Sequence, residues 1–113
     1  MDPDTIRDLF ANLGPVRIRR MFGGQGIYLG ELMFALEAGG ELYLKSDSST
    51  TEAFRAAGSR PFTYERDGRT ARMNYWRLPD AAVDDPDEAA RWGKLALDAA
   101  RRSSRAKSHK RQA

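Results

Sequence analysis

Apolar residues alternate with polar ones, or form short runs, along the middle of the chain. Val16 and Ile18 alternate with Arg17 and Arg19, which predicts a half-buried strand over residues 16–21. Apolar runs bounded by turn residues predict five more strands, at residues 26–29, 33–36, 42–45, 62–66 and 69–75. The second and third strands are unbroken apolar runs, so we expect them in the centre of a sheet.

Short glycine-containing turns join several of these strands. Gly30-Glu31, Gly39-Gly40 and Asp67-Gly68 are pairs that favour tight hairpins, because glycine adopts the positive φ that such turns require. Strands joined by hairpins run antiparallel. The pattern therefore predicts an antiparallel sheet of five to six strands.

Apolar residues recur at helical spacing in a segment near each end of the chain. The first segment follows Asp2, a candidate N-cap, and Pro3, and it ends at Gly14. The last segment follows Asp85 in the same way. The two apolar stripes are Ile6, Leu9, Phe10 and Leu13, and Ala89, Trp92, Leu95, Ala96 and Ala99.

A shorter helix is predicted between the fourth and fifth strands, ending at Gly58. Residues 49–52 read Ser-Thr-Thr-Glu, a capping box in which Ser49 and Glu52 would each bond a free backbone N–H. The resulting order is helix, four strands, helix, two strands, helix. It predicts an α+β fold in which N-terminal, middle and C-terminal helices flank the sheet.

The composition narrows the class of protein. A chain of 113 residues suffices for one domain. Cysteine is absent, which excludes disulfides, thiolate-bound metals and a cysteine nucleophile. No apolar run reaches membrane-spanning length, and the acidic start of the chain lacks the apolar region of a secretory signal. We therefore expect a cytoplasmic protein.

The charge is unevenly distributed along the chain. Residues 101–113 hold no acid and six basic side chains, namely Arg101, Arg102, Arg105, Lys107, Lys110 and Arg111. Removing these six from the 19 Lys and Arg leaves 13 against 16 Asp and Glu, a net charge of −3 in residues 1–100. We expect a folded domain over residues 1–101 and a disordered basic tail over residues 102–113. The tail either solubilises the chain or contacts nucleic-acid phosphates.

Glycines 23, 24 and 26 allow two interpretations. Glycine-rich loops can cradle an anion with backbone N–H groups, as phosphate-binding loops do. Those loops lead from a strand into a helix, whereas Gly23, Gly24 and Gly26 lead into another predicted strand. The context favours a structural turn over an anion-binding nest.

The aromatic residues also allow two interpretations, a base-stacking surface or core packing. They include Phe34, Tyr43, Phe62, Tyr64, Tyr75 and Trp76. Tyr43 and Lys45 would share one strand face, as would Arg69 and Tyr75. Because no consecutive basic-aromatic run is present, we favour core packing for most of them.

Groups for catalysis are sparse in the sequence. The one histidine, His109, lies in the polar tail, where nothing would orient it. Asp84, Asp85, Asp87 and Glu88 cluster at a helix start, where capping explains them better than metal binding. We predict no enzyme activity, no metal and no cofactor.

Several segments resemble the TfoX/Sxy family in register over about residues 4–101. They begin Arg-Met-Phe-Gly-Gly-Gln-Gly-Ile-Tyr at Arg20, Met-Phe-Ala at Met33, Leu-Tyr-Leu-Lys-Ser-Asp at Leu42, Pro-Phe-Thr-Tyr at Pro61 and Met-Asn-Tyr-Trp-Arg-Leu-Pro at Met73, with Trp92 following. The chain is similar to the N-terminal domain of that family. The resemblance implies a small α+β domain with no catalytic residues.

The resemblance also implies a biological setting. Full-length relatives are regulators of natural competence that act with the cyclic-AMP receptor protein at a subset of promoters. They carry a second, helical C-terminal domain where this chain has its basic tail, so we expect a stand-alone domain of the kind common in bacteria.

We therefore expect a non-enzymatic regulatory domain that acts through a protein partner, with a weak nucleic-acid contribution from the tail. The alternative is a small-molecule-binding domain, or a minor enzyme, with a pocket between sheet and helix. The candidate ligand or partner surface consists of Arg20, Tyr43, Lys45, Tyr64 and Arg69. An exposed sheet edge would also allow a homodimer.

Overall fold

A computed structural model of the chain describes residues 1–21 and 23–112, without the side chains of residues 64, 66, 71–73 and 107–112. The elements are α1 (Pro3–Leu9), β1 (Arg17–Met21), β2 (Gly24–Leu29), β3 (Leu32–Ala38), β4 (Glu41–Lys45), α2 (Thr51–Ala56), β5 (Pro61–Arg66), β6 (Arg69–Arg77), the 3-10 helix η1 (Asp80–Ala82) and α3 (Pro86–Gln112). This confirms the predicted order of helices and strands.

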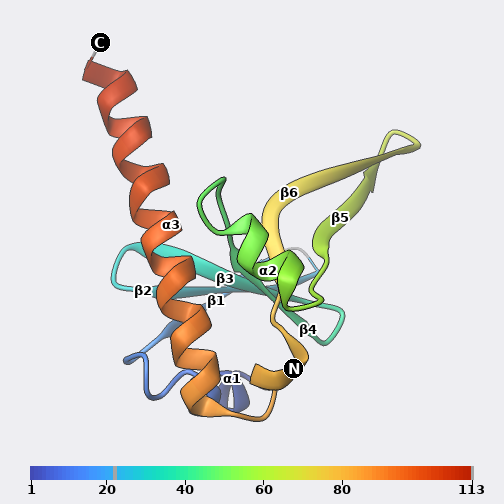
Figure 1. Cartoon of the computed structure of the whole chain (residues 1–113), viewed down its shortest axis with the longest axis vertical. Coiled ribbons are helices and arrows are strands. Elements are labelled where there is room, and N and C mark those ends of the chain that lie inside the picture. The colour runs from blue at the N-terminus through green and yellow to red at the C-terminus, as the bar shows by residue number, and fades with distance from the viewer. Residues whose placement is uncertain (22, 113) are drawn as a thin grey trace.

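The strands form one antiparallel sheet with the order β1-β2-β3-β4-β6-β5 (Figure 1). Hairpins join β2 to β3, β3 to β4 and β5 to β6, as the glycine-containing turns predicted. The predicted α+β fold is confirmed. The end of the β5–β6 hairpin extends away from the rest of the molecule (Figure 1).

The core lies between the three helices and one face of the sheet. Phe10, which follows α1, packs edge-on against Phe34 of β3, with ring centroids 5.3 Å apart. The ring of Phe54 in α2 packs against two tryptophans, with its centroid 4.9 Å from that of Trp92 in α3 and 6.2 Å from that of Trp76 in β6. These aromatic contacts connect all three helices to the same face of the sheet.

The two terminal helices begin as predicted. Asp2 is the N-cap of α1 and Pro3 follows it. At the start of α3, Oδ1 of Asp85 accepts hydrogen bonds from the backbone N–H groups of Asp87 and Glu88. The regular part of α1 ends at Leu9, and a turn continues the chain to Gly14.

The predicted capping box at residues 49–52 is wrong. The N-cap of α2 is Thr50, one residue after Ser49, and no side chain caps the helix there. Because the helix starts at Thr51, Glu52 is too early to fold back on the cap, and it pairs with Arg55 instead.

The last helix continues without a break past residue 101, where the sequence placed the end of the domain. It covers the sheet with its first half, and its C-terminal turns extend beyond the sheet (Figure 1). No helix within the described residues combines the length and the apolar character needed to cross a membrane.

Candidate functional site

The face of the sheet that points away from the helices carries the most distinctive surface chemistry. Directly paired residues share a face, and neighbours along a strand alternate between faces. Ile27, Ala35 and Leu44 pair successively across β2, β3 and β4 and belong to the buried core. Leu36 and Tyr43, one position along, pair with each other and therefore point to the opposite face.

We call this opposite face the open face. The residues on it that matter here are Arg17, Arg19, Tyr28, Leu36, Glu41, Tyr43, Lys45, Tyr75 and Arg77. None of them belongs to the apolar cluster that the helices cover. The open face thus combines aromatic rings with cationic groups.

Aromatic rings and cations are in contact on the open face. The guanidinium carbon of Arg17 lies 4.8 Å from the centre of the Tyr28 ring, and Nζ of Lys45 lies 5.2 Å from that of Tyr75. The Tyr43 ring meets Phe62 edge-on at 4.7 Å. Tyr28 and Tyr43 are half-buried, so part of each ring meets solvent.

Tyr75 forms the buried floor of the open face. Its side chain is 7% exposed, and Leu36, two strands away on the same face, is 6% exposed. Burial, with a smaller contribution from Tyr28, raises the pKa of Tyr75 to about 12. The Tyr75 hydroxyl therefore stays neutral well above physiological pH.

A hollow of about 320 Å³ lies at one side of the open face, lined by Glu41, Tyr43, Arg60, Pro61, Thr63 and Arg77. Nε of Arg77 donates to Glu41 at 2.8 Å and its Nη1 to Asp80 at 2.7 Å. These two bonds raise the pKa of Arg77. Glu41, the carboxylate of this hollow, is thus already neutralised.

The five residues predicted as a ligand or partner surface lie in different places. Tyr43 and Lys45 are neighbours on the open face. Arg20 of β1 lines a separate hollow with Gln25 and Glu37. Arg69 lies at the far end of β6, and the side chain of Tyr64 is outside the described residues. The role of the set as a binding surface stays a prediction.

The predicted glycine turn lies partly inside a strand. Gly23, with φ +69°, lies between β1 and β2, whereas Gly24 and Gly26 belong to β2. A Cβ on Gly24 would lie 1.9 Å from the backbone oxygen of Glu37. Glycine is required there by the close approach of β3.

Glu37 is a buried carboxylate beside this close approach. It accepts hydrogen bonds from Nε2 of Gln25 at 2.7 Å and from the backbone N–H of Gly40 at 3.0 Å. Burial alone would raise the pKa of Glu37, but these bonds and the nearby ammonium group of Met1 hold it below the usual value. A carboxylate so bonded is a weak base.

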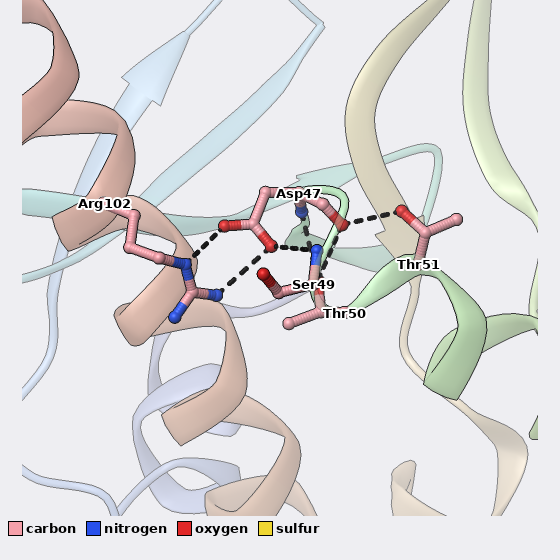
Figure 2. Close-up of polar contacts among 5 residues, drawn as sticks. All are labelled: Asp47, Ser49, Thr50, Thr51 and Arg102. Atoms are coloured by element: carbon pink, nitrogen blue, oxygen red, sulfur yellow. Dashed lines mark hydrogen bonds and ion pairs between the residues drawn. The ribbon is translucent and has the colours of Figure 1, made fainter.

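Asp47 organises the start of α2 and also holds α3 (Figure 2). Its Oδ2 and Oδ1 accept bonds from Nε and Nη2 of Arg102 at 2.6 and 3.2 Å. Oδ1 also accepts from the backbone N–H of Ser49, and the backbone oxygen accepts from the Thr51 hydroxyl. The Arg102 bond is the main cause that lowers the pKa of Asp47.

The cations of the C-terminal segment have different surroundings. Arg102 is committed to Asp47, and Arg101 pairs with Asp98 one turn earlier in α3. Arg105 is exposed, and the side chains of Lys107, Lys110 and Arg111 lie outside the described residues. Their contact with nucleic acid stays a prediction.

A cavity lies between α1, the β3–β4 turn and the segment that follows η1, and its lining includes Glu41 and Arg77 of the open face. Its volume is about 400 Å³, and its wall includes the apolar side chains of Leu9, Leu42 and Leu78 and the charged side chains of Asp8 and Arg77. Among the side chains that the structure describes, no three His, Asp or Glu are grouped so as to hold a metal ion.

Sequence comparison places this fold in a family. The TfoX N-terminal domain matches residues 8–100. The chain belongs to the TfoX N-terminal domain family. Protein Sxy of Escherichia coli (strain K12) is 28% identical over 94 residues, which cover 83% of this chain and 45% of the relative. The chain therefore spans about half the length of the curated relative it matches.

Two features of this TfoX N-terminal domain escaped sequence reasoning. The alternation in β1 placed Arg17 and Arg19 on one face, but it gave no indication that Tyr28 lies across from Arg17. The Asp47–Arg102 pair joins residues 55 positions apart, and no local pattern could have signalled it.

Proposed function

We propose that this TfoX N-terminal domain is a regulatory domain without catalytic activity that binds a protein of the transcription machinery. The family match over residues 8–100 carries the proposal. The similarity to Protein Sxy over 83% of the chain supports it. Competence-type regulation, which the family resemblance implies, is the setting we propose.

The state of the carboxylates supports a binding role over a catalytic one. Glu37 and Asp47 have lowered pKa values and accept several hydrogen bonds, and Glu41 is bonded to Arg77. A general base needs a pKa near the working pH and a free lone pair towards its substrate. These three groups act as structural links.

Affinity purification with the full chain as bait tests the proposal. We expect the bait to retain RNA polymerase or a transcription factor, identified by mass spectrometry, and the complex to form again from the two purified proteins. An unrelated domain of similar size and charge is the control bait. Failure to reconstitute a complex with any transcription protein would contradict the proposal.

Small-molecule binding is a second candidate, favoured by the cavity of about 400 Å³ beside Leu9, Leu42 and Leu78. A ligand at 100 times its Kd adds about 2.7 kcal/mol to the free energy of unfolding. A thermal-shift screen of nucleotides, sugar phosphates and carboxylic acids would therefore detect it. The Leu42→Phe variant, whose larger side chain would fill the cavity, should abolish a shift in melting temperature that comes from a ligand bound there. A screen in which no compound shifts the melting temperature would reject this candidate.

A further inference from the structure

We propose that the open face binds single-stranded nucleic acid, with bases on Tyr28 and Tyr43 and phosphates on Arg17 and Arg19. Proteins that bind single strands combine stacking aromatic rings with a positively charged surface that follows the backbone. The open face has both components on neighbouring strands of one rigid sheet.

The two tyrosines are placed to receive separate bases. Tyr28 lies on β2 and Tyr43 on β4, two strands apart, which corresponds to about 10 Å between the strands. Both rings are half-buried, so they are fixed in place yet keep an exposed part. Tyr75 and Leu36 form the buried layer that supports them.

The charge of the open face differs from that of the domain as a whole. Residues 1–100 carry a net charge of −3, but β1 contributes Arg17 and Arg19 and no acid to the open face. No described carboxylate forms an ion pair with Arg17 or Arg19. Arg17 donates a long hydrogen bond, 3.5 Å, to the backbone oxygen of Gly30, and with no acid neutralising either guanidinium both can bind phosphates.

The position of the cations favours nucleic acid over a protein partner. The centre of a protein–protein interface is depleted of charged side chains. Here Arg17 lies over the Tyr28 ring and Lys45 over the Tyr75 ring, so cations lie directly on two of the aromatic rings. At the centre of the face, Leu36 is 6% exposed, and the exposed apolar side chain, Met21 at 46%, lies on the edge strand β1.

The test is fluorescence anisotropy of a labelled oligothymidylate with the full chain at low salt. We expect binding that weakens as salt rises, and the Tyr28→Leu variant should bind between fivefold and about a hundredfold more weakly. Leucine preserves apolar packing at this site. If Tyr28→Leu does not fold, as judged by circular dichroism, Tyr43→Leu replaces it.

Matched charge variants separate the open face from general electrostatics. Arg17→Ala/Arg19→Ala should weaken binding and reduce the slope of log K against log salt by about 1.4, or roughly 0.7 per phosphate contact. Arg7→Ala/Arg91→Ala removes the same charge from exposed sites on the helical side and should leave binding nearly unchanged. An oligouridylate arm distinguishes RNA from DNA as the preferred strand.

Three results would overturn the proposal. The first is no binding of the oligonucleotide at low salt. The second is that the Arg7/Arg91 and Arg17/Arg19 variants weaken binding equally, or that neither tyrosine variant changes the affinity. Either result would mean that the oligonucleotide binds elsewhere, such as on the basic C-terminal segment. The third is that polyglutamate binds as tightly as the oligonucleotide and that Tyr28→Leu does not weaken its binding. This result would indicate an acidic protein partner.

Discussion

Gly24 and Glu37 show how single residues fix the geometry between β2 and β3. The backbone oxygen of Glu37 occupies the space where any side chain at position 24 would begin. The carboxylate of Glu37 in turn bonds Gln25 on β2 and Gly40 in the next turn. The close backbone approach at Gly24 and the hydrogen-bonded carboxylate of Glu37 therefore both hold β2 and β3 together at the same point of the sheet.

Gly24→Ala should lower the free energy of unfolding by about 3 kcal/mol, because relief of the clash requires the backbone to move. Urea denaturation measures the loss. Gly26→Ala is the matched control. Its Cβ would meet the flexible side chain of Met21 at 2.7 Å, so a cost of about 1 kcal/mol is expected. Equal costs for the two variants would show that the strands are not held so closely at Gly24.

Glu37 should contribute to the dependence of stability on pH. Its folded-state pKa lies below the ordinary value of 4.5, so its contribution is complete above that pH and is lost as pH falls through the folded-state pKa. The Glu37→Gln variant should therefore lose less stability on acidification. At neutral pH its free energy of unfolding should be about 1–2 kcal/mol lower, because the new amide N–H group would face the donors of Gln25 and Gly40.

Urea denaturation at neutral and acidic pH measures this difference. The exposed Glu52→Gln, which removes a carboxylate from α2, should keep the pH dependence of the unchanged protein. If Glu37→Gln keeps it too, the lowered pKa of Glu37 is not a source of stability.

The helices are positioned by tertiary contacts as well as by their own sequences. Asp47 bonds the first turn of α2 and reaches Arg102 near the middle of α3. Arg102 is 39% exposed and Asp47 26% exposed, so solvent screens the pair. The pair therefore contributes modestly to global stability and mainly restrains the part of α3 that leaves the sheet.

Arg102→Ala should increase amide hydrogen exchange severalfold in residues 100–106 of α3 and leave residues 89–97 protected, because only the far part loses its contact with Asp47. Arg101→Ala removes a neighbouring cation that pairs within the helix and should change exchange much less. A double-mutant cycle of Asp47 and Arg102 should give a coupling below about 1 kcal/mol. Uniform loss of protection along α3 would contradict this local role.

The whole molecule depends on one core that both tryptophans share. Phe54 is fully buried and contacts Trp76 of β6 and Trp92 of α3. The core therefore joins the middle helix, the last helix and the sheet. Because the described residues form a single apolar core, we expect the elements to unfold together.

Phe54→Ala should lower the free energy of unfolding by about 3–5 kcal/mol through the cavity it leaves. Far-ultraviolet circular dichroism and tryptophan fluorescence should report the same urea midpoint, both before and after the substitution. Val83→Ala, at a site 41% exposed, should cost less than about 0.5 kcal/mol. Separate midpoints for the two signals would show that α3 and the sheet unfold independently.

Local sequence patterns were enough to predict the order of the main helices and strands, because hairpin pairs such as Asp67-Gly68, cap residues such as Asp85 and apolar spacing act over a few residues. The tertiary structure alone decided the pairing of β4 with β6, the placement of Tyr28, Tyr43 and Tyr75 on one face, and the Asp47–Arg102 contact. These depend on which distant segments pack together, and local patterns carry no such information. The same packing gives an acidic domain a basic aromatic surface.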